Sequence, residues 1–336
     1  MAHDPKRCRG DAAGPDLVLS AMPNQPEAAH FDRHAGILIK AARRVEPRRR
    51  VRPYLFLVPS FVFLTTFTYY PILASLERSL YRSSATMPHA TFVGLGNYFA
   101  LPGDSIFRQV VANSALFLVG TVPVTMALAL ILALLLNRAH ALTTPFRTAF
   151  FYPTQLPLVG AAAIWLFVYT PGYGLLDVYL RRIVGGGGVN WLGTPALALP
   201  ALMILTIWKN AGYYMLFYLA GLQTIPTELY EAGRLEGASA VRQFQAITWP
   251  LLGPTTLFVA VIASINAFQS VDQVWLMTGG GPDNRTNLLL FYIYQVAFQF
   301  FDLGKAATLT VFLLAVLMTI AALSFGLLER RIHYEV

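Results

Sequence analysis

Polar side chains recur inside two long apolar stretches of the sequence, where such residues are costly and commonly functional. Lys209 and Asn210 lie about ten residues into the stretch 197–220, which is a depth of about 15 Å on a helix that rises 1.5 Å per residue. The stretch 255–276 carries four polar residues spaced i, i+3, i+4 and i+7, with a carboxylate near its end: Asn266, Gln269, Ser270, Gln273 and Asp272. On a continuous helix this spacing places the four on one face.

The chemistry of these groups allows two roles. Neutral amides both donate and accept hydrogen bonds and therefore suit hydroxyl-rich molecules, and Lys209 would suit a phosphate. A polar stripe on an apolar helix indicates either a water-filled path or hydrogen bonds between helices. For Lys209 the alternative to a path is a structural pair with a carboxylate such as Asp272. The residues alone leave both roles open.

The elements that position these groups are apolar helices. The chain of 336 residues is 56% hydrophobic and 12% charged, with a mean hydropathy of +0.53, whereas soluble domains carry about 25% charged residues. A membrane-spanning helix needs about 20 mostly apolar residues. Six stretches qualify: 54–76, 110–136, 148–169, 197–220, 255–276 and 304–328. We therefore expect an all-α polytopic membrane helix bundle with about six transmembrane helices.

Two regions follow from composition and charge. Residues 1–50 are rich in Pro, Ala, Arg and Asp without an apolar period and are predicted to be a disordered basic cytoplasmic tail, and 51–336 a transmembrane domain. The basic tail beside the first apolar stretch places both termini in the cytoplasm of a bacterial cell by the positive-inside rule. The outer connections, including 171–172 and the glycine run 185–188, are predicted to be flexible loops.

Several functions are disfavoured by what the sequence lacks. Because the positive charge is mainly a property of the tail, nucleic-acid binding is not expected. Cys8 is the only cysteine, so no intrachain disulfide and no thiolate metal site can form, and we expect no metal. An intramembrane enzyme needs a nucleophile and a base on facing helices, but all six histidines lie outside the predicted spans. An ion-coupled secondary transporter remains an alternative, with Asp272 as thin support.

The connection 221–253 is long for a loop and has helical character. It reads GLQTIPTELYEAGRLEGASAVRQFQAITWPLLG, which predicts two short amphipathic helices joined at Gly237. Thr227 is the expected cap of the first helix and Pro250 closes the second. An ordinary cytoplasmic loop would fit the same pattern.

Here the sequence resembles a known family. The residues Glu231-Ala232, Gly237-Ala238, Phe244, Ile247 and Pro250 resemble the EAA motif of ABC importer permeases, with Gly233 in place of the usual Ala and Trp249 in place of the usual Leu. The flanking residues 208–209, 219–223 and 276–282 are similar to the maltose- and glycerol-3-phosphate-type branch of that family. The similarity extends from about residue 54 to the end of the chain.

The resemblance implies a type I ABC importer permease-like bundle: a non-catalytic subunit for a sugar or sugar-like solute, glycerol-3-phosphate or a derivative being one choice. In this family the 221–253 loop is a coupling segment that sits in a cleft of a separate, paired ATPase. The permease binds no cofactor, because the partner ATPase uses the ATP. The other implied partners are a homologous second permease, an extracytoplasmic solute-binding protein and membrane lipid.

The resemblance and the polar pattern together give two sets of candidate residues. The predicted ATPase-coupling residues are Glu231, Ala232, Arg234, Gly237, Ala238, Phe244 and Pro250. Glu231 is the expected charged contact with the ATPase, and Arg234, one turn on, is its expected local partner. The predicted solute-pathway residues are Lys209, Asn210, Asn266, Gln269, Asp272 and Gln273. A contact with the second permease is a further alternative for Lys209.

Overall fold

The computed structural model describes residues 47–84, 89–137, 143–185 and 188–329. The predicted tail therefore falls almost entirely outside the described residues. The chain divides into two compact units, residues 1–70 and residues 71–336. In the first unit the described residues form α2 (Pro47–Leu64) and the π-helical turn η3 (Thr65–Tyr69), which leads into α3 (Tyr70–Ser79).

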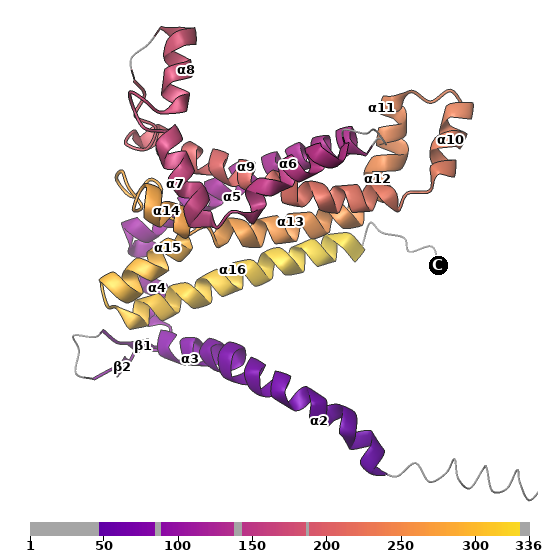
Figure 1. The fold of residues 1–336 in the computed structure, drawn as a ribbon. Helices are drawn as coiled ribbons and strands as arrows, with labels where there is room; N and C mark the ends of the chain where they lie inside the picture. The colour runs from indigo at the N-terminus through magenta and orange to yellow at the C-terminus, as the bar shows by residue number, and fades with distance from the viewer. Residues whose placement is uncertain (1–46, 85–88, 138–142, 186–187, 330–336) are drawn as a thin grey trace, which may run out of the picture. The chain divides into compact units, whose positions relative to one another are not determined.

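The second unit is almost entirely helical (Figure 1). A two-residue hairpin pairs β1 (Tyr81–Arg82) with β2 (Thr91–Phe92) in antiparallel register. The helices that follow are α4 (Gly96–Ala100), η4 (Leu101–Gly103), α5 (Ser105–Leu136), α6 (Thr143–Gln155), α7 (Leu158–Val168), α8 (Leu175–Val184), α9 (Pro195–Gln223), α10 (Thr227–Leu235), α11 (Ala240–Gln243), η5 (Phe244–Thr248), α12 (Trp249–Leu251), α13 (Gly253–Phe268), α14 (Asp272–Met277), α15 (Leu289–Tyr294), η6 (Gln295–Gln299) and α16 (Leu303–Glu329).

The predicted spans are largely present as long helices. Four described stretches are long and apolar enough to cross a membrane: Phe56–Ser79, Ser105–Leu136, Gly253–Met277 and Leu303–Ser324. The helices α6 and α7 add a fifth if they form one span, although they are bent by 99°. The remaining predicted span corresponds to α9, whose 29 residues reach about 44 Å. The pair Lys209-Asn210 interrupts its apolar surface.

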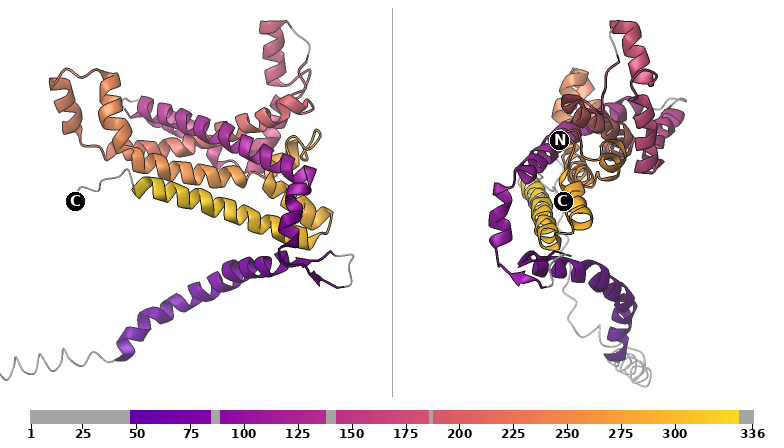
Figure 2. Two further views of the ribbon diagram at one scale, coloured as in Figure 1. Left: turned by 180° about the vertical axis from the view of Figure 1, so that it is seen from behind. Right: turned by 90° about the vertical axis from the view of Figure 1, so that its left-hand side faces the viewer.

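The helices α5, α9, α13 and α16 of the second unit lie side by side in both views of Figure 2. α9 lies against α5 and α6, and α13 lies against α5, α9 and α16. The contact between α9 and α6 depends on Gly212, because a Cβ there would collide with the carbonyl oxygen of Phe150. The buried side chains fall into three apolar clusters, which include Leu222 and Leu252 near α10, Phe117 and Leu202 in the middle, and Val110 and Leu309 near α4.

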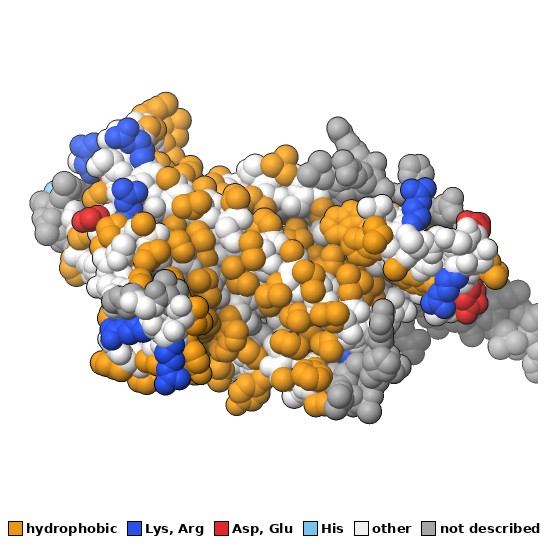
Figure 3. Space-filling view, turned by 90° about the horizontal axis from the view of Figure 1, so that it is seen from above, with side chains coloured by type: hydrophobic (Ala, Val, Ile, Leu, Met, Phe, Trp, Pro, Cys, Tyr) orange, Lys and Arg blue, Asp and Glu red, His pale blue; other side chains and the backbone are white. Residues whose placement is uncertain are grey.

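Much of the apolar surface of this unit remains uncovered. Three of the spans, which begin at Ser105, Gly253 and Leu303, each contain an apolar stretch of 18 residues. Only 28–39% of the residues in these stretches are buried inside the chain. On the face drawn in Figure 3, hydrophobic side chains cover the middle and charged side chains gather at the two ends. This pattern is typical of a protein whose middle meets hydrocarbon and whose ends meet water.

Candidate functional site

The segment between α9 and α13 folds as a helical hairpin around Gly237. Gly237 has a φ of +76°, which a side chain rarely adopts. Its N–H donates to the carbonyl of Arg234 at 3.0 Å, and the N–H of Ala238 donates to the carbonyl of Gly233 at 2.8 Å. These two bonds form a Schellman motif that ends α10. The predicted bend at Gly237 is present, and the hydroxyl of Ser239 caps α11 by accepting from the N–H of Arg242.

The predicted cap of α10 was wrong. Pro226 occupies the N-cap position and Thr227 is the first helical residue, without a side-chain capping bond. Because Pro226 has an extended ψ of 133°, the backbone turns into the helix one residue earlier than the sequence indicated. Pro250 lies in α12, which ends at Leu251, so the predicted end of the second helical segment is close to the observed one.

This hairpin is anchored to the long helices. The hydroxyls of Tyr230 on α10 and Thr248 on η5 lie 2.9 Å apart in a hydrogen bond, and Thr248 is buried. Phe244 and Ile247 pack with Tyr230 against the apolar cluster that includes Leu222 and Leu252. The hairpin is therefore fastened to the ends of α9 and α13 through packed side chains.

The outer surface of the hairpin is exposed and only partly polar. Of the predicted coupling residues, Glu231, Ala232, Arg234, Gly237 and Pro250 are exposed, and Ala238 and Phe244 are half-buried. The local pair Glu231–Arg234 is absent, since the ion pairs among the described residues are Arg181–Asp177 and Lys305–Asp104. The carboxylate of Glu231 is therefore available to a partner.

Two apolar side chains on this surface were missed by the sequence reasoning. Leu235 is 91% exposed and Val241 is 66% exposed, one on each side of Gly237. Exposed apolar residues beside charged ones at the tip of an anchored hairpin are typical of a protein-binding surface. No sequence signal distinguishes these two, because an apolar residue near the end of a short helix is equally compatible with packing.

The predicted polar stripe on 255–276 is broken rather than continuous. α13 ends at Phe268, and α14 begins only at Asp272. As a result the four residues predicted to share one face differ in burial: Asn266 is half-buried, Ser270 and Gln273 are buried, and Gln269 is exposed, as is Asp272. The one-face arrangement was wrong because it assumed an uninterrupted helix.

Two of these residues line the same interior pocket. Asn210 on α9 and Asn266 on α13 are joined there by hydroxyl-bearing side chains from α5 and α9: Thr121, Thr125, Thr206 and Tyr214. The amide of Asn266 donates to the hydroxyl of Tyr214 at 3.0 Å, and the amide of Asn210 donates to the carbonyl of Thr206 at 3.0 Å. Among the residues lining this polar pocket none is charged.

Gln273 and Lys209 have structural partners. The side chain of Gln273 is hydrogen-bonded to the hydroxyl of Thr206 at 2.9 Å, which joins α14 to α9. The ammonium of Lys209 donates to the carbonyls of Thr154 and Leu156 at 3.1 and 2.7 Å, and the hydroxyl of Thr154 donates to the carbonyl of Lys209 at 2.9 Å. Lys209 therefore satisfies carbonyls that the break between α6 and α7 leaves open.

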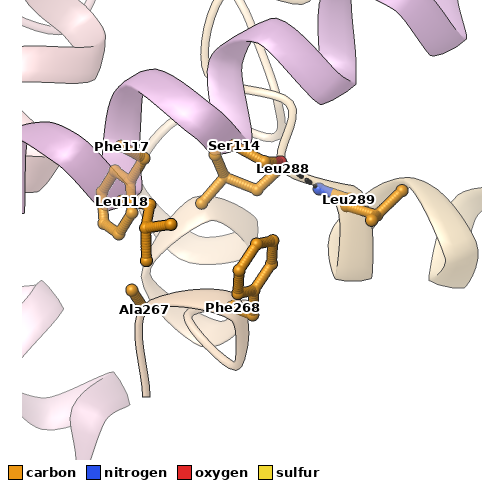
Figure 4. A pocket seen from close by; sticks show the side chains of 7 residues that line it. All are labelled: Ser114, Phe117, Leu118, Ala267, Phe268, Leu288 and Leu289. Atoms are coloured by element: carbon orange, nitrogen blue, oxygen red, sulfur yellow. Dashed lines mark hydrogen bonds between the residues drawn. The ribbon is translucent and has the colours of Figure 1, made fainter. Parts of the chain in front are cut away.

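A neighbouring pocket is apolar and serves packing. It lies between α5, α13 and the start of α15 and is lined by Phe117, Leu118, Ala267, Phe268, Leu288, Leu289 and Ser114 (Figure 4). Its one hydroxyl, on Ser114, accepts a hydrogen bond from the N–H of Leu289 at 2.9 Å. Hydroxyl-rich molecules would find no free polar group among these residues.

The end of the unit opposite α10 carries a second ion pair, which the sequence did not indicate. Lys305 on α16 contacts Asp104 at 2.6 Å, and the hydroxyl of Tyr292 donates to the same carboxylate at 3.1 Å. Partial burial acts to raise the pKa of Asp104, but the Lys305 contact and the N–H groups of Phe107 and Ile106 outweigh it and leave the pKa below its usual value. This cluster ties the start of α5 to α15 and α16.

The geometry is thus that of a membrane helix bundle with an anchored, exposed hairpin at one end. Comparison with known families agrees. Residues 93–334 match the family described as binding-protein-dependent transport system inner membrane component. The chain belongs to this family and is an inner-membrane permease subunit of an ABC importer, not an enzyme.

Individual relatives cover most of the chain. It is 35% identical to the sulfoquinovosyl glycerol transport system permease protein of Agrobacterium fabrum, over 84% of this chain and 92% of the relative. It is 33% identical to the sn-glycerol-3-phosphate transport system permease protein of the same organism, over 85% and 97%. It is 32% identical to the trehalose/maltose transport system permease protein of Thermococcus litoralis, over 82% and 94%.

Solved structures share the fold. A bacterial ABC transporter involved in the import of the acidic polysaccharide alginate superposes with a TM-score of 0.74 at 21% identity, covering 84% of this chain and 96% of that one. The predicted type I permease fold is therefore confirmed.

Proposed function

We propose that this permease imports a hydroxyl-rich, sugar-like solute and that the hairpin α10–α12 couples it to a separate ATPase. The observation that carries the proposal is the hairpin itself. It exposes Glu231, Leu235 and Val241, while Tyr230 and Phe244 fasten it to the long helices. Such a segment can receive a push from a partner and pass it on as a rigid-body movement.

The partners follow from this role. The chain supplies no ATP site of the G-x-x-x-x-G-K-S/T kind, so hydrolysis is the task of a paired ATPase that grips the hairpin from the cytosol. A second, homologous permease completes the pore, and an extracytoplasmic solute-binding protein delivers the solute. One of the structural relatives is described as a complex with an alginate pentasaccharide-bound periplasmic protein, which supports this assembly.

The polar pocket has a free volume of only about 10 Å³ in this structure and must open to admit a solute, and its chemistry favours a polyhydroxylated one. Asn210, Asn266 and Tyr214 offer neutral donors and acceptors, which match sugar hydroxyls. Lys209 is occupied by two backbone carbonyls, so it is not a free cation for a phosphate. The curated relatives carry names of glycosides, disaccharides and glycerol-3-phosphate, and the pocket favours recognition through the hydroxyl groups that such molecules share.

The test is ATPase stimulation in the reconstituted transporter. The permease is assembled in proteoliposomes with its ATPase, its second permease and its solute-binding protein, and a panel of neutral sugars, glycosides and glycerol phosphates is added. We expect a sugar or glycoside to stimulate both hydrolysis and uptake. Solute uptake by the permease without any ATPase would overturn the proposal.

The orientation of the hairpin is tested separately by labelling. In a Cys8→Ser background, Gln245→Cys on the exposed side of η5 and Ser105→Cys at the start of α5 are treated with a membrane-impermeant maleimide. In intact cells we expect Ser105→Cys to react and Gln245→Cys to be protected until the membrane is opened. The reverse pattern would place the hairpin outside the cell and remove the coupling role.

A further inference from the structure

The helix α8 presents an apolar face that nothing in the described chain covers. Leu175, Tyr179 and Ile183 recur at i, i+4 and i+8 and are 54%, 60% and 79% exposed. Leu176 on the adjoining side is half-buried and packs against the middle apolar cluster. α8 is thus attached along one side and open along the other.

A buried carboxylate fixes the orientation of this helix. Asp177 accepts from the N–H of Gly172 before α8 and from the N–H of Val189 after it, both at 2.8 Å, and pairs with Arg181 at 3.0 Å. The two backbone N–H groups and then Arg181 hold the pKa of Asp177 below its usual value, so it is ionised at neutral pH. The loops at both ends of α8 are therefore tied to one side chain.

The direction of α8 differs from that of the spans. In both ribbon views it runs across the direction of α5, α13 and α16 and projects from the unit, beyond the end of α7 and at the end opposite α10 (Figures 1 and 2). Since the long helices cross the membrane, a helix that runs across them at the end of a span lies along the membrane surface.

The charge on α8 suits that position. Its last turn carries Arg181 and Arg182, both exposed; since Arg181 is paired with the buried Asp177, the only acidic residue of the helix, Arg182 gives α8 its net positive charge. An amphipathic helix with an apolar face and arginines lies in the plane of the lipid headgroups, where the arginines meet phosphates and the apolar side chains reach the acyl boundary.

We propose that α8 is an interfacial helix whose Leu175–Tyr179–Ile183 face inserts into the outer surface of the bilayer and steadies the α7 end of the permease against lipid. Lipid phosphate is the occupant favoured by the exposed arginines and by the direction of α8. The proposal depends on the chain being a membrane permease and not on which solute it carries.

The experiment measures the depth of a spin label in the assembled transporter in nanodiscs of phosphatidylcholine and phosphatidylglycerol. In a Cys8→Ser background the label is placed at Ile183→Cys and, as a matched water-side control, at Ser105→Cys. We expect the label at position 183 to be more accessible to oxygen than to a water-soluble nickel chelate, and to lie about 5–10 Å below the phosphates. The label at position 105 should show the opposite preference.

Three outcomes would overturn the proposal. A label at position 183 that is as accessible to the nickel chelate as the label at 105 means that the face is in water. Shielding that arises only when the solute-binding protein is added means that a protein covers it. Shielding from oxygen and from the nickel chelate alike means that the second permease covers it. A variant Arg182→Gln should leave uptake intact and reduce the depth when phosphatidylglycerol is present, which a purely structural role of Arg182 would not produce.

Discussion

The hairpin α10–α12 and the polar pocket between α5, α9 and α13 are built in opposite ways. The hairpin packs some side chains against the long helices. It leaves others that could bind a partner, such as Glu231 and Leu235, exposed and without partners in the described chain. The pocket pairs its amides with neighbouring hydroxyls and carbonyls, as in Asn266 with Tyr214. A surface that must grip another protein is left unsatisfied, whereas polar groups in hydrocarbon must be satisfied until a solute replaces their partners.

The difference predicts different consequences of mutation. Changes on the hairpin should leave folding intact and disconnect hydrolysis from uptake. Changes in the pocket should alter uptake, stability or both, depending on whether the side chain meets solute or only another helix.

The largest effect is expected for Gly237→Val. A β-branched residue at positive φ costs about 1–3 kcal/mol, and the Schellman motif that ends α10 would distort. We expect uptake to fall between about fivefold and about a hundredfold, since about 1.4 kcal/mol corresponds to a factor of ten, while the protein still inserts. The measurement is solute uptake and stimulated ATPase in proteoliposomes. Gly253→Ala is the control, because a Cβ at Gly253 meets no atom within 4 Å. An equal loss of uptake in both variants would mean that any added side chain in this region impairs transport, and that the positive φ at Gly237 is not the cause.

The next largest effect is expected for Glu231→Lys. A bond to a charged group contributes about 1.5–3 kcal/mol, so reversal of an exposed carboxylate that meets the ATPase should reduce uptake about tenfold. Glu228→Lys is the matched control, since Glu228 is an exposed carboxylate on the same helix. Uptake and co-purification of the ATPase are compared in the two variants. If both variants lose the ATPase equally, net charge governs docking. Glu231 is then not a specific contact residue of the hairpin.

Within the pocket, Asn266→Leu and Gln273→Leu should differ from each other. Asn266→Leu replaces a polar side chain that lines the pocket by an apolar one, so we expect a severalfold loss of uptake with basal ATPase retained. Gln273→Leu removes the hydrogen bond that joins α14 to Thr206, whose hydroxyl keeps its bond to the carbonyl of Leu202; the loss costs about 0.5–1.5 kcal/mol and should lower the melting temperature. Ser264→Ala is the control, because this hydroxyl on α13 bonds only within its own helix. Unchanged uptake in Asn266→Leu would make the pocket structural.

Much of the hairpin was predictable because its signals are local. Gly237 between two amphipathic stretches, and the spacing of Phe244 and Ile247, specify a bend and an anchored face without knowledge of the rest of the fold. The exposure of Leu235 was not evident, since a leucine at the end of a helix is equally compatible with packing. Whether it has a neighbour depends on where the helix points.

The interior was less predictable because its partners are distant in sequence. No proline or glycine marks the break between α13 and α14, where the hydroxyl of Ser270 bonds to the carbonyl of Asn266. α8 is an intermediate case. Leu175, Tyr179 and Ile183 show its period, but the surrounding glycines favoured a flexible loop. The carboxylate that orders it, on Asp177, accepts from N–H groups that lie 5 and 12 residues away from it in the sequence.

The smallest effect is expected for Lys209→Met, and it decides whether Lys209 belongs with the pocket or with the scaffold. The ammonium stabilises the open carbonyls of Thr154 and Leu156, and hydrogen bonds between helices in membranes contribute about 0.6 kcal/mol on average. Methionine keeps the length of the side chain but not its donors, so we expect a melting temperature lower by a few degrees and uptake reduced no more than about twofold. Lys209→Arg, which keeps the donors, should restore stability. Lys209→Met could instead abolish uptake of a phosphorylated solute, spare a neutral one and leave stability unchanged. In that case the ammonium contacts the solute, and the solute pathway extends from the polar pocket to α6.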